Sequence, residues 1–428
     1  MPAVLSIAYI DRLPSELLSC ILRIVESENS RREGATSRMK FVLAKVCRRW
    51  RSVAHGTAQL WADLPVTLNT LPAYVVFIFS LTQHAPLALT IDLARQLPHP
   101  PGTTGVLESA ALEDFLRSVA PILAKRAMQV QRLHIVAFFE RELRQALIAL
   151  GPLSDTVLKD LHLEVICPRP LDEELDGAPE PLPLWHFNSC VQTLSLINVP
   201  LLRANIMFGN VASLTLDRFA GLTWSDLSSG LRGMPVLETL ALWGPVCGDY
   251  NTDDVVCLPT VTMFEVKIMG SSDMTKAITL LRMPALTWLR ISRTNGAVKP
   301  VLDALGNALS GVTRLDLYSK PMERGSRHED EISTVWERTP NLTIVNFGKT
   351  VYTDMKKFTS TLKENPGKLP GLKSIRTEYG FPSASITGLL QSTGATVITP
   401  SSETGFTEER WDLEGGVARR TRFTVWAV

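Results

Sequence analysis

The chain has 428 residues, 45% of them hydrophobic, and 44 Lys and Arg against 43 Asp and Glu give it a formal net charge of +1. This composition excludes a disordered or fibrous protein, and the length is too great for one ordinary single-core domain. The balanced charge gives no general attraction to nucleic acid or to an acidic membrane. We therefore expect neither nucleic acid nor a membrane among the partners.

The first two helical patterns lie near the N-terminus. Leu13, Leu17 and Ile21 recur every fourth residue of a predicted helix at 13–25, and Leu18 belongs to a second such row. Pro14 and Glu16 suit its first turn, since proline needs no amide partner there and a carboxylate complements the positive helix end.

A polar stretch at 26–40 then predicts an exposed loop. A second helical pattern at 41–56 has Val46 and Trp50 in one row, and Trp61 follows it. Two or three helices bury little surface by themselves. Their apolar face must therefore pack against either the rest of the chain or a partner.

The residues of this segment resemble the F-box, through the order Leu13-Pro14-x-Glu16-Leu17-Leu18, then Ile21, then Val46-Cys47-Arg48-x-Trp50 and finally Leu60-Trp61. F-box proteins bind a small Skp-family adaptor, which links them to a cullin–RING ubiquitin ligase. The resemblance covers about 50 of the 428 residues, and the polar insertion at 27–40 is longer than in compact F-boxes. It implies adaptor contacts from Leu13, Pro14, Glu16, Leu17, Leu18, Ile21, Val46, Cys47, Trp50 and Trp61. The alternative is that these helices only cap the repeats that follow.

An apolar run at 71–81 is too short for a membrane span, which needs about 20 residues, and predicts a buried helix instead.

Residues 1–12 lack the basic region and cleavage site of a signal peptide, so none is expected. The six cysteines form no C-x-x-C pair and several lie in apolar runs, which favours buried, reduced thiols and an intracellular location, cytoplasmic or nuclear.

One short pattern, apolar-x-x-Leu-x-Leu, returns along the rest of the chain. It occurs at 86–92, 130–136, 158–165, 191–198, 211–218, 237–244, 261–268, 286–293, 312–319, 342–349 and 372–379. From residue 133 to residue 375 the copies are 20 to 33 residues apart, close to the leucine-rich-repeat period, with a proline-rich insertion at 168–183.

Helical patterns at 114–127 and 301–311 separate some of these predicted strands. An x-Pro-x-Leu tetrapeptide recurs just before strands, at 234–237, 283–286, 339–342 and 369–372. We interpret each proline as ending a helix and starting the extended segment.

A strand–helix unit cannot bury both of its faces, so stacked units predict a parallel sheet with outer helices. The expected fold class is α/β, with an F-box-like helical module at 8–64, an irregular leucine-rich-repeat-like solenoid at 65–400 and a C-terminal β-hairpin cap at 401–428. The hairpin prediction rests on a Glu-Gly-Gly turn at 414–416.

The residue between the two leucines of each strand and those just after them face outward and can touch a ligand. The candidates, taken from between the leucines, are His134, His162, Ser195, Thr215, Ala241, Glu265, Arg290, Asp316, Asn346 and Arg376. Their charge is mixed, which favours a protein or peptide target over nucleic acid.

No catalytic motif is present. There is neither H-E-x-x-H nor G-x-S-x-G, and Gly348-Lys349-Thr350 lacks the earlier glycine of a phosphate loop because Thr343 stands there. His134 and His162 occupy equivalent positions two predicted strands apart, but without a carboxylate or cysteine we expect no metal there. We therefore predict no catalytic residue, no metal and no cofactor.

The sequence thus predicts a substrate-recognition adaptor of a Skp–cullin–F-box ubiquitin ligase, with an unknown protein target on its repeats. The alternative is a leucine-rich-repeat scaffold that is not an enzyme and has no ubiquitin role. A third hypothesis is an α/β enzyme of undetected type, which a parallel sheet closed into a barrel would favour over an open arc.

Overall fold

The structure is a computed structural model. It describes residues 13–33, 39–94, 104–151, 157–167, 191–199, 209–218, 223–246, 250, 254–268, 272–293, 299–319, 338–348, 360, 362, 364, 369–377, 395–400, 407–414 and 417–424. The chain divides into two compact units. The N-terminal unit is Met1–Val199 with Arg203–Ile206, and the C-terminal unit is Pro200–Leu202 with Met207–Val428.

Helices open the N-terminal unit. They are α2 (Ser15–Glu33), α3 (Met39–Leu43), α4 (Arg48–Gly56), α5 (Ala58–Trp61) and α6 (Pro72–Thr82). The loop predicted from residue 26 is wrong as far as Glu33, because Glu, Ser, Asn and Arg are polar yet compatible with a helix and residues 26–33 contain no Gly or Pro. The single helix predicted over 41–56 is in fact two, since Cys47 is extended (φ −156°, ψ 175°) and caps α4.

Trp61 holds this helical region together. Its side chain is fully buried, and its Nε1 donates a hydrogen bond to the carbonyl of Ala54 at 2.7 Å. Phe41, His55 and Phe77 meet its ring edge-to-face, with ring centroids 5.3, 5.7 and 6.3 Å away. Burying so large an aromatic side chain is a major part of the stability of a small helical cluster.

Helix α6 confirms the helix predicted at 71–81, but only one of its faces is buried. Val75 and Ile78 are fully enclosed, whereas Val76 and Phe77 are 54% and 42% exposed. Among the described residues, no helix combines the length and the apolar character that a membrane crossing requires.

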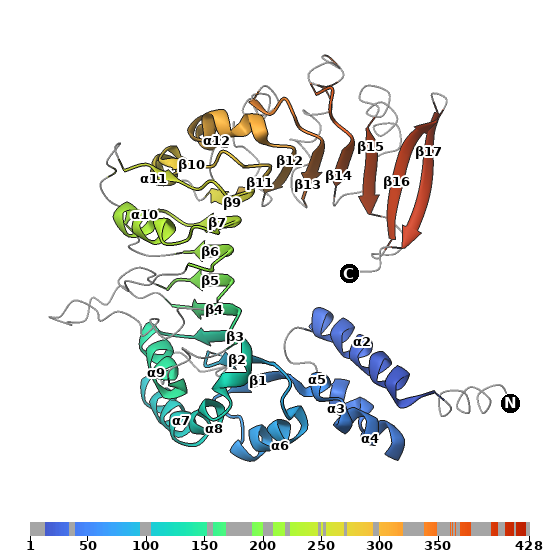
Figure 1. Cartoon of the computed structure of the whole chain (residues 1–428), viewed down its shortest axis with the longest axis vertical. Helices are drawn as coiled ribbons and strands as arrows, with labels where there is room; N and C mark the ends of the chain where they lie inside the picture. Colours follow the sequence, from blue (N-terminus) through green and yellow to red (C-terminus); the bar gives the residue numbers. More distant parts are fainter. Residues whose placement is uncertain are drawn as a thin grey trace. The chain divides into compact units, whose positions relative to one another are not determined.

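The sheet of the N-terminal unit begins after α5, with α6 between its first two strands (Figure 1). Its strands are β1 (Asp63–Thr67), β2 (Leu87–Asp92), β3 (Val130–Ala137), β4 (Asp160–Val165) and β5 (Thr193–Ile197), all parallel and in this order. Between them lie α7 (Thr104–Ser118), α8 (Ala120–Ala124), the 3-10 turn η1 (Ala127–Gln129) and α9 (Glu140–Leu150). The repeat pattern predicted β2 to β5 but missed β1, whose Pro65 is tolerated because β1 is the first strand in the order.

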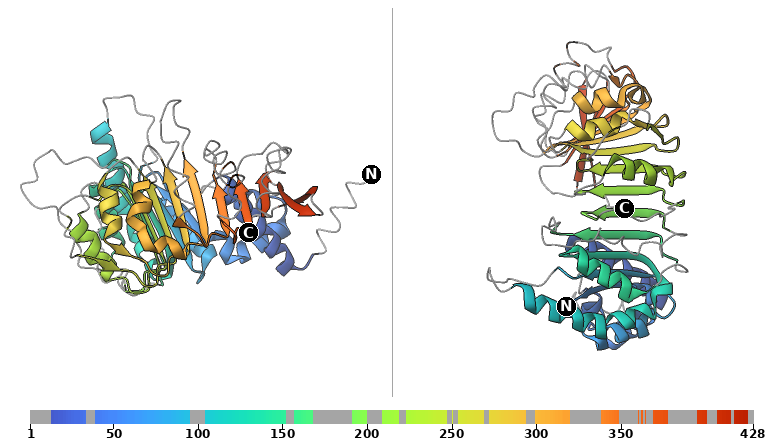
Figure 2. Two further views of the ribbon diagram at one scale, coloured as in Figure 1. Left: turned by 90° about the horizontal axis from the view of Figure 1, so that it is seen from above. Right: turned by 90° about the vertical axis from the view of Figure 1, so that its left-hand side faces the viewer.

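The C-terminal unit has a longer sheet. Its elements are β6 (Ser213–Asp217), α10 (Trp224–Arg232), β7 (Thr239–Trp243), β8 (Val256–Cys257), β9 (Met263–Ile268), α11 (Ser272–Thr279), β10 (Leu281–Arg282), β11 (Trp288–Arg293), α12 (Lys299–Leu305), η3 (Gly306–Gly311), β12 (Arg314–Ser319), β13 (Ile344–Phe347), β14 (Ser374–Thr377), β15 (Thr396–Pro400), β16 (Thr407–Glu414) and β17 (Val417–Thr424). The order β6-β7-β9-β11-β12-β13-β14-β15 is parallel, and β8 and β10 form a separate small pair. Figures 1 and 2 show α10, α11 and α12 beside these strands.

Strand order is linear in the described part of each unit, so neither sheet closes into a barrel. The α/β class with large parallel sheets and accompanying helices is therefore confirmed. The predicted hairpin is also confirmed, since β16 and β17 pair antiparallel with Glu414 opposite Val417.

The x-Pro-x-Leu tetrapeptides are tight turns rather than simple helix stops. The amides of Leu237, Leu286 and Leu342 each donate to the carbonyl three residues earlier at 3.2 Å, and that of Leu372 does so at 3.1 Å. Proline takes the second position of each turn, where its fixed φ is favourable. The first and last residues of every turn are buried, so the turn anchors each strand in the core.

A ladder of threonines sets the step between strands β9 to β13. The amide of Thr287 donates to the carbonyl of Thr262, that of Thr313 to Thr287 and that of Thr343 to Thr313, at 2.8 to 2.9 Å. Each of these three hydroxyls donates to the same carbonyl, at 3.2, 3.3 and 2.9 Å. The same two hydrogen bonds thus join each strand to the next, although the number of residues between these threonines varies.

The described cysteines Cys20, Cys47, Cys167 and Cys257 are free thiols, as expected. None of the four is buried, which contradicts the prediction of buried thiols, because the apolar runs around them turn only one face inward. Cys190 and Cys247 lie outside the described residues.

The turn at Gly311 gives a test of this stacking. A Cβ on Gly311 would lie 2.8 Å from the backbone carbonyl oxygen of Leu286, which cannot move without shifting the ladder. We expect Gly311→Ala to lower the free energy of unfolding by about 1–3 kcal/mol, measured by urea denaturation. Gly371→Ala is the control, since its Cβ would stand 3.7 Å from the equivalent Leu342 oxygen. Equal effects of the two changes would contradict this view of the turn.

Candidate functional site

An exposed apolar face on α2 is the first candidate surface. Leu17, Ile21 and Ile24 are 52%, 39% and 61% exposed, and their spacing puts them on one side of the helix. Leu18 and Leu22, each about 100° further around the helix than Leu17 and Ile21, are 1% and 0% exposed. The helix is therefore apolar on two sides, and only one of them is covered by the described residues of the chain.

The predicted adaptor-binding residues divide by exposure. Pro14, Glu16, Leu17, Ile21 and Val46 are exposed, and Leu13, Cys47 and Trp50 are half-buried. Leu18 and Trp61 are buried inside the helical region and do not present a surface. Their physical role here is to fix the helices that carry the exposed members.

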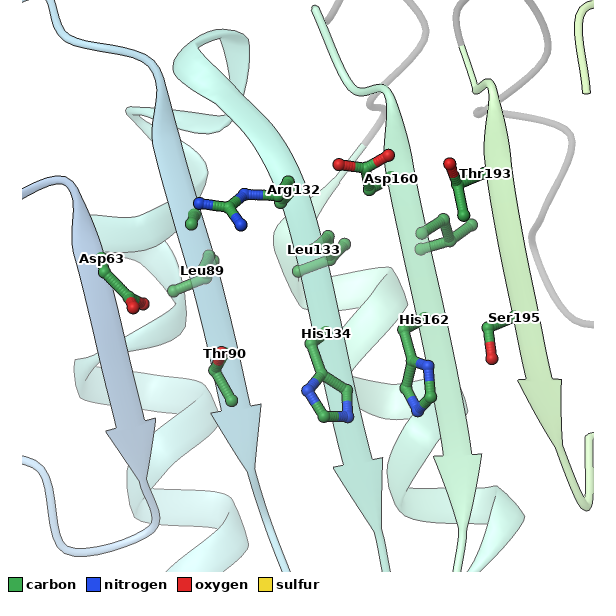
Figure 3. Close-up of a pocket in the computed structure, with 12 residues that line it drawn as sticks. Asp63, Leu89, Thr90, Arg132, Leu133, His134, Asp160, His162, Thr193 and Ser195 are labelled. Carbon is green, nitrogen blue, oxygen red and sulfur yellow. The ribbon is translucent and has the colours of Figure 1, made fainter. Parts of the chain in front are cut away.

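A row of polar side chains on the sheet of the N-terminal unit forms the second surface. Thr90, His134, His162 and Ser195 are register partners on β2 to β5. Figure 3 shows them in front of the strands, with helices behind. They line a hollow of about 310 Å³ with Asp63, Ala88, Leu89, Arg132, Leu133, Asp160, Leu161 and Thr193.

The two histidines of this row are direct neighbours. They were predicted two strands apart, but β3 and β4 are adjacent, since no further strand forms between them, and the ring centroids are 4.1 Å apart at 81°. Burial, and secondarily the nearby His162, lowers the pKa of His134 from 6.5 to about 4, and burial also lowers the pKa of His162. Both imidazoles are therefore neutral at pH 7, free to accept a hydrogen bond or to bind a metal.

A carboxylate that the sequence reasoning missed stands beside them. Glu164 lies two residues after His162 on the same strand and so on the same face, and its Oε2 is 3.8 Å from His162 Nε2. The strand alternation that placed the histidines outward would also have placed Glu164 there. Glu164 comes just after the second leucine, a position that was also predicted to face outward, but the candidate residues were taken only from between the leucines.

Charged side chains line one edge of the hollow. Asp63 on β1, Arg132 on β3 and Asp160 on β4 lie at one register level. Burial raises the pKa of the Asp63 carboxyl against the opposing effect of Lys40 and Arg132. Lys40 in turn is buried, which lowers its pKa, and its Nζ donates to the backbone carbonyl of Asp63 at 2.7 Å.

The sheet of the C-terminal unit carries the corresponding row. Pairing places Thr215, Ala241, Glu265, Arg290, Asp316, Asn346 and Arg376 side by side at one level of seven adjacent strands. Within each unit, the positions between the leucines therefore form one row across the paired strands.

A network of charges occupies the middle of this row. Arg290 contacts Glu265 at 3.1 Å and Asp316 at 3.5 Å. Asp316 is completely buried and also accepts from Trp288 Nε1 at 3.0 Å and from Arg314 Nε at 3.1 Å. Several donors meeting one buried carboxylate hold the surface rigid, since each is a charged or directed hydrogen bond.

Burial corrects part of the predicted target surface. Ala241, Glu265 and Asp316 are 3%, 8% and 0% exposed, and Arg290 contacts the two carboxylates. Burial raises the pKa of Glu265, while Arg290 opposes the shift. The accessible members of the row are Thr215, Arg290, Asn346 and Arg376.

Aromatic side chains extend the accessible part of this surface. The guanidinium of Arg314 lies 3.8 Å from the ring centroid of Trp288, and that of Arg290 lies 5.3 Å from the same ring and 5.6 Å from Tyr318. Trp288 precedes Arg290 by two residues and so shares its face. Stacked aromatic and guanidinium groups of this kind are common at protein-binding surfaces.

No model of a known protein family matches the chain, and no curated protein matches it. The roles of these residues therefore follow from their geometry and chemistry alone.

The charge network predicts a large effect at one buried carboxylate. Asp316→Asn removes the charge that Arg290 and Arg314 share, and we expect a loss of about 2 kcal/mol in the free energy of unfolding. The loss is smaller than for a fully enclosed pair because both arginines are about one-third exposed and regain water. Asp303→Asn is the control, since that carboxylate is 47% exposed in its ion pair with Arg338 and should contribute less than about 1 kcal/mol. Denaturant unfolding of both variants checks this, and similar losses would contradict it.

Proposed function

We propose that this chain is a non-catalytic substrate receptor of a Skp–cullin–F-box ubiquitin ligase. The single observation that carries the proposal is the exposed apolar face of α2, within a segment whose sequence resembles the F-box. Leu17 and Ile21 belong to that resemblance and are exposed, whereas Leu18 of the same motif is buried and holds the helix in place.

The adaptor would bind through this face. Covering a leucine or isoleucine side chain contributes about 1.5–3 kcal/mol, so two or three such residues together supply a substantial part of a micromolar interaction. Val46, 57% exposed just before α4, would add to the same docking module.

The target would bind on the outward rows of the sheets. Their mixed charge, their stacked arginine and tryptophan side chains and the hollow in the N-terminal unit suit a protein or peptide better than a nucleic acid. The mechanism is positional: holding target and ligase in one complex raises the effective concentration of target lysines near the transfer enzyme. The chain itself supplies no reacting group in this mechanism, which would operate in the cytoplasm or the nucleus.

A scaffold without a ubiquitin role is the second candidate. It is favoured by the burial of Trp61, whose ring contacts Phe77 of α6, so the helical region also covers the start of the repeats. In that case the exposed face of α2 would bind no Skp-family adaptor.

Binding of a purified Skp-family adaptor to the full chain distinguishes the two. Leu17→Asp places a charge in the proposed contact without disturbing the core, because the side chain is 52% exposed. We expect adaptor affinity to fall at least about 10-fold, measured by isothermal titration calorimetry, with an unchanged thermal melting curve. Ile24→Asp, on the same face, should act likewise.

Val157→Asp is the matched control, since Val157 is 49% exposed in a loop outside the docking module. It should bind the adaptor as the unmodified chain does. Absence of binding by the unmodified chain, or equal binding by the Leu17 variant, would reject the ligase proposal and leave the scaffold.

A further inference from the structure

Three metal-ligating groups meet at the hollow of the N-terminal unit. The ligand atoms of His134, His162 and Glu164 all lie within 4.8 Å of one another. His134 and His162 are register partners on adjacent parallel strands, and Glu164 follows on the same face of β4. Their backbone positions are therefore fixed by the sheet and not by a loop.

One nitrogen atom of the cluster lacks a hydrogen-bond partner among the described residues. This atom is Nε2 of His134, which is buried. Leaving a buried polar atom unpaired costs about 1–3 kcal/mol, so such an atom calls for an explanation. A cation between the two rings and the carboxylate would satisfy it.

The carboxylate adds negative charge to the two imidazoles. Glu164 is 31% exposed and its Oε2 lies 3.8 Å from His162 Nε2, so its single negative charge would offset part of the double charge of a cation bound beside the rings.

We propose that His134, His162 and Glu164 bind one Zn²⁺ ion, with a fourth position open to the hollow. Two imidazoles and a carboxylate form a common zinc ligand set, and three protein ligands leave one place for water or for a group of a bound molecule. Ser195, on the neighbouring strand at the same level, lines the space where that fourth ligand would stand.

The distances allow this with small side-chain adjustments. Ligand atoms at about 2.0–2.1 Å in a tetrahedral site are about 3.3 Å apart. His162 Nε2 and Glu164 Oε2 are 3.8 Å apart, so side-chain rotation of a fraction of an ångström brings them to that separation. The strands can stay where they are.

An open zinc position would also take a histidine, cysteine or carboxylate of another protein as its fourth ligand. The zinc proposal does not depend on the ligase proposal, since metal binding is measured on the chain alone.

Zinc binding to the full chain tests it. The purified, metal-free chain is titrated with Zn²⁺ against a chromophoric competitor, and Co²⁺ is used in parallel for its visible absorption. We expect one bound ion per chain and a tetrahedral Co²⁺ spectrum. Glu164→Gln and His162→Ala should each weaken zinc binding at least about 10-fold, since even outer contacts of a metal site cost this much.

Asp160→Asn is the matched control, as it removes a carboxylate from the same strand and the same hollow without touching the cluster. It should leave zinc affinity unchanged. The proposal is overturned if the unmodified chain binds no zinc at micromolar concentrations, or if Glu164→Gln binds it as Asp160→Asn does. Melting curves recorded without metal show that each variant is folded, so a lost site is not confused with a lost fold.

Discussion

The parallel pairing of neighbouring strands through one buried leucine or other apolar residue is the constraint on which the rest of this protein depends. Leu133, Leu161 and Leu194 in one unit, and Leu240, Phe264 and Leu289 in the other, are all at most 2% exposed and stand in register. A one-residue slip would turn each of them outward and every outward side chain inward. The position of each candidate binding residue is therefore decided by apolar burial on the opposite face of its strand.

Polar groups reinforce this register. Threonine hydroxyls and amides repeat the same contact from strand to strand, and proline turns hold the start of each strand against the core. Because the register is fixed on both faces, side chains from distant parts of the sequence meet in fixed pairs. His134 with His162, and Arg290 with Asp316, are consequences of this arrangement.

The helical region at the N-terminus is stabilised by packing of aromatic side chains and not by strand pairing. Its core is one tryptophan with aromatic neighbours, which is small for an independent domain. Helix α2 buries Leu18 and Leu22 and leaves Leu17 and Ile24 outside. Such a helix gains stability when a partner covers Leu17 and Ile24, and the proposed function is assigned to this surface for that reason.

The sequence by itself determined the class of fold, eleven strands at the recurring Leu-x-Leu pattern, the terminal hairpin and the outward row, because strand alternation and helical periodicity are local properties of the chain. It missed β1, β8, β10 and β15, which lack that pattern, and it ended the first helix too early because polarity alone does not stop a helix. Only the tertiary structure decided that Asp316 is buried beneath its arginines, that Leu18 and Trp61 face the core, and that Glu164 joins two histidines. The reason is physical: burial and coordination depend on which strands become neighbours, and hydrogen-bond pairing between distant segments sets that, whereas the spacing of residues along the chain does not.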